Sequence, residues 1–254
     1  MSGDNKDQPN IFYSKEFTES KENLLMQGKV KSVYQMAGEP QKVYVHFHDK
    51  VTAGNGKKVD YPDGKGKVCC LISALLFEYM EKNNVKTHYL GTEGLDTLLC
   101  RKLEIIPIEI IVRNIAAGSI VKQTTISDGT IISPPIVEYF LKDDAKDDPL
   151  LTEDRIKLMG YGDEIPALQH HAREINAILK GVFRKIGLTL VDFKLEFGYD
   201  SEQNLLLADE LSPDGMRLWK KGTKESFDKD LFRKGEGDIV EAYNIILSKI
   251  KKII

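Results

Sequence analysis

The most chemically distinctive part of the sequence is an alternating stretch from Val191 to Gly198. As a β-strand it places its large apolar side chains on one face and Asp192, Lys194 and Glu196 together on the other. A polar turn and a second apolar run follow, which predicts a hairpin that brings Asp209 opposite Glu196. Two carboxylates beside a lysine suit Mg²⁺ held against ATP phosphates, because Mg²⁺ needs only one or two protein carboxylates. A solvated strand face with alternating charge would show the same pattern.

A second candidate for phosphate binding lies near the N-terminus. Lys29, Lys31 and Val33 fall on one face of an expected strand, directly after Gly28. Glycine lets a backbone approach a ligand closely, and the two lysines project to one side, so this segment is able to cover phosphates. An exposed strand edge is the alternative, since the pattern is neither a Walker A loop nor a kinase glycine-rich loop.

Three further clusters combine arginine or lysine with turn residues. They are the segments Arg113 to Ser119, Ser212 to Trp219 and Asp228 to Arg233. Arginine binds phosphate in a bidentate manner, which suits a sugar phosphate. Each cluster taken alone would also fit a surface turn or an ion pair.

Composition narrows the class of protein. The 254 residues are 41% hydrophobic and 30% charged with a net charge of −3, as in an ordinary globular protein. The 36 basic and 39 acidic residues give no electrostatic case for nucleic acid or an anionic membrane as partner. The longest apolar stretches are too short to span a bilayer, which needs about 20 residues. Three cysteines without zinc-ligand spacing predict a reduced protein of the cytoplasm.

The elements that must position these residues follow from periodicity and turn signals. Helices are predicted at Val68–Asn83, Pro166–Ile186 and Gly237–Lys251. Strands are predicted at Leu25–Gln35, Lys42–Phe47, Thr87–Leu90, Thr97–Lys102, Ile108–Val112, Leu190–Gly198 and Leu205–Glu210. Because strands and helices do not alternate regularly, we expect an α+β fold with largely antiparallel sheets. Pro107 suggests a boundary between an N-terminal lobe, 1–106, and a C-terminal lobe, 107–254.

In chain order these clusters resemble one family, the aminoimidazole-succinocarboxamide ribotide (SAICAR) synthetases. The matching segments are Gly28–Tyr34, Thr52–Gly56, Val112–Ser119, Ser133–Glu138, Lys142–Pro149, Val191–Gly198, Ala208–Trp219 and Asp228–Arg233. The resemblance runs from about Leu24 to Tyr243, and eight motifs in family order make it highly specific.

The resemblance implies a two-lobed fold with antiparallel sheets that sandwich ATP, similar to ATP-grasp and kinase-like enzymes. It implies a ligase that uses ATP and Mg²⁺ to join L-aspartate to carboxyaminoimidazole ribotide (CAIR) in purine biosynthesis. The expected partners are therefore these small molecules, together with further copies of the chain in a homo-oligomer such as a dimer. A free-standing synthase is expected, without an added enzyme domain.

The resemblance also assigns roles by motif. For the nucleotide it implies Lys29 and Lys31 on phosphates, Ile105 at the adenine, and Val33 and Lys142 also in contact with the nucleotide. For the metal it implies Glu196 and Asp209. For the ribotide it implies Arg113, Ser119 and Arg217, helped by Lys229 and Arg233. Lys194 would act at the reacting carboxylates, and Asp192 would orient substrate.

The sequence departs from the family pattern at two positions, where Lys50 and Lys220 replace acidic residues. If the missing acid before Thr52 orients a substrate amine, Asp49 would have to serve instead. Two alternatives to a ligase remain. A small-molecule kinase would share the Mg-ATP site, although the catalytic-loop and Asp-Phe-Gly motifs of protein kinases are missing. A nucleotide-binding module without activity would draw its support from the two lysines.

Overall fold

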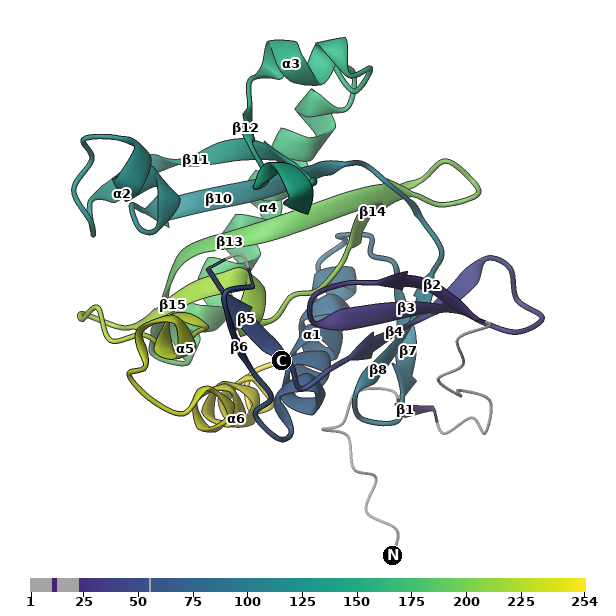
Figure 1. Ribbon diagram of the computed structural model, residues 1–254, viewed down its shortest axis with the longest axis horizontal. Coiled ribbons are helices and arrows are strands. Elements are labelled where there is room, and N and C mark those ends of the chain that lie inside the picture. The colour runs from purple at the N-terminus through teal and green to yellow at the C-terminus, as the bar shows by residue number, and fades with distance from the viewer. Residues whose placement is uncertain (1–10, 13–22, 55) are drawn as a thin grey trace, which may run out of the picture.

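The computed structural model describes residues 11–12, 23–54 and 56–254, and it shows two large sheets with helices packed around them (Figure 1). Asn55, within one of the family-like segments, lies outside the described residues. Almost all strand pairs are antiparallel, which confirms the α+β class expected from the sequence. In the described part of the chain no helix is long and apolar enough to cross a membrane.

The first sheet is built from the N-terminal part of the chain. Its six strands lie in the order β1-β7-β8-β4-β3-β2. Their bounds are β1 (Ile11–Phe12), β2 (Leu24–Gln27), β3 (Lys31–Gln35), β4 (Lys42–Phe47), β7 (Tyr89–Glu93) and β8 (Thr97–Arg101). A separate small hairpin joins β5 (Val51–Ala53) to β6 (Lys58–Asp60).

The second sheet has seven strands and is organised around one long strand, β13 (Leu188–Tyr199). β10 (Ile108–Ile115), β14 (Leu205–Ala208), β15 (Met216–Lys220) and β9 (Glu104–Ile105) all pair with it. β11 (Ile131–Leu141) and β12 (Leu150–Leu151) extend the sheet beyond β10. Every segment that borders β13 is thereby fixed in register with it.

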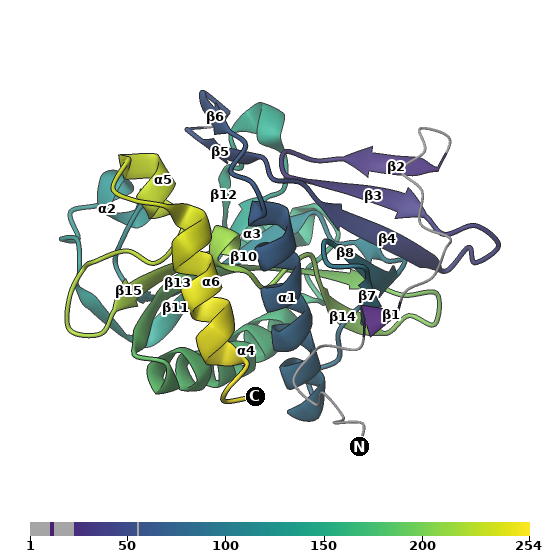
Figure 2. The same ribbon diagram turned by 90° about the horizontal axis from the view of Figure 1, so that it is seen from below.

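Helices cover these sheets and join them. α1 (Lys65–Lys82) packs on strands of the first sheet and against α6 (Ile239–Ile250), and the two helices lie side by side in Figure 2. α4 (Ile165–Lys185) packs its apolar stripe on β10, β11 and β13. The shorter helices are α2 (Ser119–Gln123), α3 (Glu153–Leu158) and α5 (Asp230–Lys234). One hydrophobic core runs through both sheets.

Three expectations from the sequence need correction. The segment Leu25–Gln35 is not one strand, because a turn at Gly28–Val30 divides it into β2 and β3. Lys29 therefore lies in a turn rather than on a strand face. The strand expected at Thr87–Leu90 begins at Tyr89 instead, and Thr87 forms an isolated bridge to Leu207.

Several elements were not expected, β11 foremost among them. Its adjacent Pro134 and Pro135 argue against a strand, because proline cannot donate a ladder hydrogen bond. The structure accommodates them where the pairing of β10 with β11 is irregular, between Arg113 and Ile115. α2, α3 and β15 were also missed; they are short, and α2 and α3 each span fewer than two helical turns.

The first turn of α1 depends on close backbone contact with β4. The carboxylate of Asp49 accepts hydrogen bonds from the backbone N–H groups of Gly64 (3.1 Å) and Gly66 (2.8 Å). A Cβ atom at Gly66 would overlap the carbonyl group of Phe47, a backbone group that cannot move aside.

We therefore expect Gly66→Ala to destabilise the fold by about 2–4 kcal/mol, as overpacking and backbone displacement do. Gly181→Ala is a matched control in the C-terminal part of α4, where a Cβ meets nothing within 4 Å. That change should stabilise by about 0.5–1 kcal/mol, because alanine favours helix more than glycine does. Chemical denaturation of both variants measures the difference. Equal stability would contradict the close packing of α1 on β4.

Candidate active site

Charged side chains from both sheets meet in a group that we name the lysine–carboxylate cluster. It consists of Lys31, Glu109, Lys142, Lys194, Glu196, Asp209 and Glu210. Lys31 comes from β3 of the first sheet, and Glu196 comes from β13 of the second. The hairpin of β13 and β14 pairs Glu196 with Ala208, one residue from the partner that the sequence predicted. Asp209 follows directly, at a positive φ of 62° that ends the strand.

Lys194 stands at the centre of this cluster. Its Nζ lies 3.0 Å from Glu109 Oε1, 2.5 Å from Glu196 Oε1 and 3.4 Å from Asp209 Oδ2. Lys31 approaches from the first sheet and bonds to Asp209 and to Glu210, the latter at 2.8 Å. Glu196 and Asp209 therefore converge on one point, where a cation already contacts both.

The charges of the cluster shift one another's protonation. Burial lowers the pKa of Lys194, but the carboxylates of Glu196, Asp209 and Glu109 outweigh it and raise the pKa well above its usual value. Burial would likewise raise the pKa of Asp209, yet Lys31 and Lys194 hold it well below its ordinary range. For Glu109 burial prevails over Lys194, and its pKa is raised. Asp209 and Lys194 are thus both charged at neutral pH.

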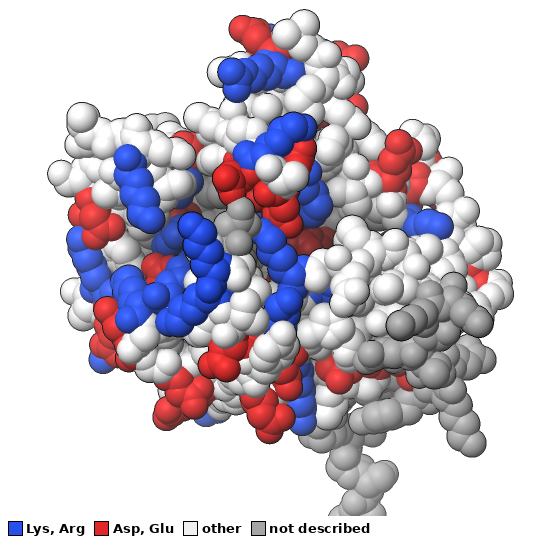
Figure 3. All heavy atoms as spheres, in the orientation of Figure 1, with Lys and Arg blue, Asp and Glu red and all other residues white. Residues whose placement is uncertain are grey.

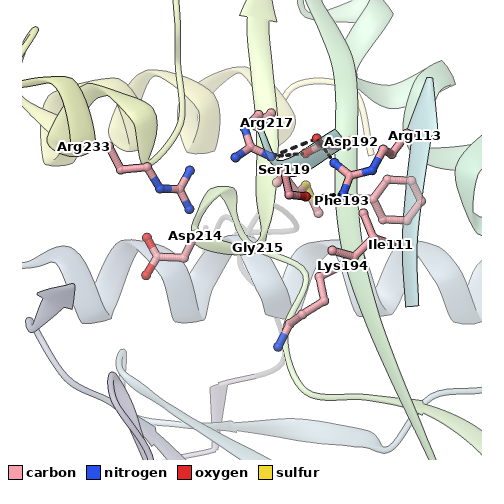
Figure 4. Close-up of a pocket in the computed structure, with 11 residues that line it drawn as sticks. Ile111, Arg113, Ser119, Asp192, Phe193, Lys194, Asp214, Gly215, Arg217 and Arg233 are labelled. Atoms are coloured by element: carbon pink, nitrogen blue, oxygen red, sulfur yellow. Dashed lines mark hydrogen bonds and ion pairs between the residues drawn. The ribbon is translucent and has the colours of Figure 1, made fainter. Parts of the chain in front are cut away.

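Next to this cluster lies a pocket of about 270 Å³ that we name the arginine pocket (Figure 4). Its lining includes Arg113, Asp192, Lys194, Arg217 and Arg233. Lys194 thus faces both the pocket and the carboxylates. Figure 3 shows Lys and Arg side chains gathered on the face where α5 and the β5–β6 hairpin lie, which favours an anionic ligand there.

Strand register sets the core of the arginine pocket. Asp192 on β13 is the direct partner of Arg113 on β10 and of Arg217 on β15, so the three residues form one row across three strands. Arg113 Nη1 donates to Asp192 Oδ2 at 3.1 Å, and Arg217 Nη1 donates to the same oxygen at 2.9 Å. Burial still raises the pKa of Asp192, although both arginines oppose the shift.

The arginines are oriented by further partners. Arg113 is 1% exposed; its Nε donates to Glu138 at 2.5 Å and its Nη2 to the Ser119 hydroxyl at 2.8 Å. Arg217 also lies 3.4 Å from Asp230, which in turn bonds to Arg233. The guanidinium groups therefore have fixed directions before any ligand arrives.

A buried ion pair anchors the turn that precedes Arg217. Asp214, on the pocket wall, pairs with Lys65 at the start of α1 and accepts a hydrogen bond from the Tyr243 hydroxyl of α6 at 2.9 Å. Burial would raise the pKa of Asp214, but Lys65 lowers it. Since Lys65 is only 1% exposed, this pair ties the pocket to both helices.

The structure brings most of the predicted site residues together. The lysine–carboxylate cluster contains five of them: Lys31, Lys142, Lys194, Glu196 and Asp209. The arginine pocket is lined by five more: Arg113, Ser119, Asp192, Arg217 and Arg233.

Four predicted residues lie outside both groups. Lys29 pairs with Asp144 at 2.6 Å, in the segment that follows Lys142. Val33 is half-buried against the core, and Ile105 is 38% exposed on β9, where it pairs with Gly198. Lys229 does not line the pocket. Burial lowers the pKa of its ammonium group, although the carboxylate of Asp214 opposes this shift.

The sequence did not predict several residues of the cluster and of the pocket wall. Glu109 carried a signal, as a single acid among the isoleucines of a predicted strand. Glu210 directly follows Asp209 and was read only as part of a strand end. Lys65 carried no local signal, because the helix was expected to begin at Val68. Its partner Asp214 lies 149 residues further along the chain, a distance that no local pattern spans.

The two departures from the family pattern can be compared with the structure at Lys220 and at Asp49, which precedes Lys50. Lys220 is exposed and forms a surface ion pair with Glu225 at 3.1 Å, away from the pocket. Asp49, which would have to replace the missing acid, already binds two backbone N–H groups at the start of α1. Asp49 therefore has a structural task, and the idea that it orients a substrate amine loses support.

Comparisons with known proteins identify the family to which the chain belongs. The family model described as SAICAR synthetase matches residues 24–250. A phosphoribosylaminoimidazole-succinocarboxamide synthase from Prochlorococcus marinus is 43% identical over 241 residues, which cover 92% of this chain and 99% of that protein. A solved SAICAR synthetase in complex with ADP is 39% identical with a TM-score of 0.85, over 89% of this chain and 96% of the other. The Ehrlichia chaffeensis synthase structure is 36% identical with a TM-score of 0.87, over 91% and 99%. The chain belongs to the SAICAR synthetase family.

Proposed function

We propose that this protein is a phosphoribosylaminoimidazole-succinocarboxamide synthase, which uses ATP to join L-aspartate to CAIR in purine biosynthesis. The observation that carries the proposal is Lys194, which contacts two convergent carboxylates and also lines a pocket with three arginines. Such an arrangement is able to hold a nucleotide phosphate and a phosphorylated carboxylate substrate side by side.

The arginine pocket would bind the ribotide. Arg113 and Arg217 present fixed guanidinium forks, which match the oxygens of a phosphate or carboxylate. Ser119 and Arg233 would add hydrogen bonds at the rim, and Lys229 would add charge near Asp214. Asp192 would act indirectly, because its carboxylate is held between the two arginines and orients them.

The lysine–carboxylate cluster would bind the triphosphate of ATP. Lys31 and Lys142 reach the carboxylates from either side, and Lys29 lies on the neighbouring turn. Val33 and Ile105 would lie near the base. Freed from their carboxylates, the ammonium groups would turn to the phosphate oxygens and neutralise charge that develops during transfer.

The donor set of the cluster fits Mg²⁺. Glu196 and Asp209 are hard oxygen donors that meet at one ammonium group. Among the described residues no three His, Cys, Asp or Glu side chains are placed to hold a metal ion together, so the protein would supply only two ligands. Mg²⁺ suits such a site, since it uses one or two carboxylates and completes its octahedron with phosphates and waters. When bound, the ion would offset negative charge on the phosphates.

The chemistry would proceed in two steps. A carboxylate oxygen of CAIR attacks the γ-phosphorus of ATP, which forms an acyl phosphate and releases ADP. The neutral amine of L-aspartate then attacks the acyl carbon, phosphate leaves, and the nitrogen loses a proton. Lys194 would hold the reacting carboxylate beside the phosphate. Positioning and charge neutralisation would supply most of the rate.

The wider setting follows from the same proposal. The three cysteines Cys69, Cys70 and Cys100 are unpaired and buried, which fits a reducing compartment such as the cytoplasm. We further propose a homo-oligomer, a dimer in the simplest case. The division into lobes at 106/107 stays a prediction; the change of sheet between β8 and β9 falls a few residues earlier, so β9 belongs to the second sheet.

The decisive experiment measures ADP release by purified protein with Mg-ATP, with CAIR and L-aspartate omitted in turn. We expect release to require both, together with a succinocarboxamide product. Full ADP release without L-aspartate would favour the small-molecule kinase, which the comparisons do not support. Nucleotide binding without turnover would favour an inactive module and direct attention to Lys50.

The metal assignment predicts that Asp209→Asn lowers turnover by at least about 100-fold, equivalent to roughly 2.7 kcal/mol of transition-state stabilisation. The variant keeps the size of the side chain but removes the charge that would bind Mg²⁺. Asp154→Asn is the control, because the Asp154 side chain is 88% exposed. ADP release is followed across Mg²⁺ concentrations. Unchanged activity of Asp209→Asn at limiting Mg²⁺ would falsify the assignment.

The ribotide assignment predicts a selective effect of Arg217→Lys. Lysine keeps the charge but loses the planar fork, so KM for CAIR should rise about 10–100-fold while KM for ATP changes little. Arg184→Lys, on the exposed end of α4, provides the control. Steady-state kinetics with each substrate varied in turn separates the two constants. An equal rise in both would argue against a ribotide role for Arg217.

A further inference from the structure

A second cavity of about 280 Å³ lies apart from the arginine pocket and the lysine–carboxylate cluster. Its apolar wall is formed by Val85, Phe197, Leu205 and Leu207. Side chains alternate along a strand, so Phe197 points to the opposite face of β13 from its neighbour Glu196. We name it the rear cavity, because it lies behind the strands that carry Glu196 and lead to Asp209.

The wall of the rear cavity favours a flat, apolar group. Phe197 and Leu207 are 2% and 1% exposed, and the ring of His171 stacks on Phe197 with centroids 6.1 Å apart and planes at 27°. Small-molecule sites are usually about 300–1,000 Å³, so this cavity has room for a fragment such as one substituted ring. Aromatic stacking gives such a ring a preferred orientation.

The polar residues at the cavity favour a negative charge on the ligand. Asn84, Lys86 and His171 line it, and their side chains carry amide, ammonium and imidazole donors. Two carboxylates are near, but each has its own partner. Glu174 lies 3.4 Å from His171 Nδ1, and Glu81 accepts from the backbone and hydroxyl of Thr87. None of the residues that line the cavity is acidic.

The cavity is also mechanically close to the cluster on the other face. The segment that follows α1 crosses to β14, where His88 N donates to Leu207 O at 2.9 Å and Leu207 N donates to Lys86 O at 3.1 Å. Leu207 is two residues from Asp209, and Phe197 adjoins Glu196. A molecule packed against both side chains would therefore restrict the spacing of the two strands behind these carboxylates.

We propose that the rear cavity is a second binding site, for a small planar aromatic carboxylate, and that its occupancy alters the binding of Mg-ATP on the opposite face. The binding itself is independent of the proposed function. Only the second half rests on it, through the roles given to Glu196 and Asp209.

Benzoate is the probe for binding, followed by ligand-observed NMR with the full chain. We expect a Kd on the order of 1 mM, as for other fragments of this size. Benzamide, of the same shape but uncharged, should bind at least about 5-fold more weakly, since it forfeits the charge-assisted bond to Lys86. Saturating ADP should leave benzoate bound. Displacement of benzoate by ADP, or equal binding of benzamide, overturns the proposal.

Variants locate the site. Lys86→Gln should weaken benzoate at least about 5-fold, whereas Lys82→Gln, on the last turn of α1 and outside the cavity lining, should not. Leu205→Trp should fill the cavity and abolish binding. If Leu205→Trp fails to fold, the two lysine variants still decide the question. If benzoate binds equally well to the natural chain, to Lys86→Gln and to Leu205→Trp, it binds elsewhere and the site is rejected.

The coupling is tested separately by KM for Mg-ATP in the ADP-release assay. Saturating benzoate should change this KM at least about 2-fold in the natural chain, and the same benzoate concentration should have less effect on Lys86→Gln. Binding with an unchanged KM rejects the coupling and keeps the site. Absence of any turnover rejects the proposed function, while the NMR result still stands or falls by itself.

Discussion

The alternation of side chains along β13 is the constraint on which the rest of the structure depends. Asp192, Lys194 and Glu196 face the site because the residues between them are buried in the core. A slip of one residue in register would exchange the two faces, placing the three charged side chains in the apolar core and turning the large apolar side chains toward the candidate site. The hydrophobic core thus fixes the direction of the charged side chains, since the apolar face can be buried in the core only when the charged face is turned toward the candidate site.

The strands beside β13 then distribute the charges of its front face. β10 and β15 place an arginine on each side of Asp192, whereas β14 leads Asp209 toward Glu196. Buried charges are costly unless they are paired, so every lysine in the cluster holds a carboxylate in the free protein. In the proposed function, phosphate groups and a divalent cation would exchange partners with these pairs, because the charges are already in place before a ligand binds.

The sequence made the local parts of this arrangement predictable. The hairpin of β13 and β14 follows from periodicity and one polar turn, and its predicted register was off by one residue. The long helix α4 was found to within one residue at each end. Local patterns failed where tertiary contact decides, as at Pro134 and Pro135, which lie where strand pairing is irregular. Roles for isolated residues such as Arg113 came from the family resemblance, because one arginine in a strand has no distinctive spacing.

The long-range ion pairs explain why the candidate site cannot be ascribed to either sheet alone. Lys31 and Asp209 are 178 residues apart in sequence, yet their bond joins β3 of the first sheet to the end of β14 in the second. Lys65 makes a second such link, from α1 to the turn that precedes Arg217. Each lobe separately would leave buried charges without partners, which is destabilising by several kcal/mol per broken pair. The boundary predicted at 106/107 stays a prediction, and β9, which precedes it, already belongs to the second sheet. The cluster and the anchored pocket exist only when the first sheet and α1 have docked on the second sheet and α6.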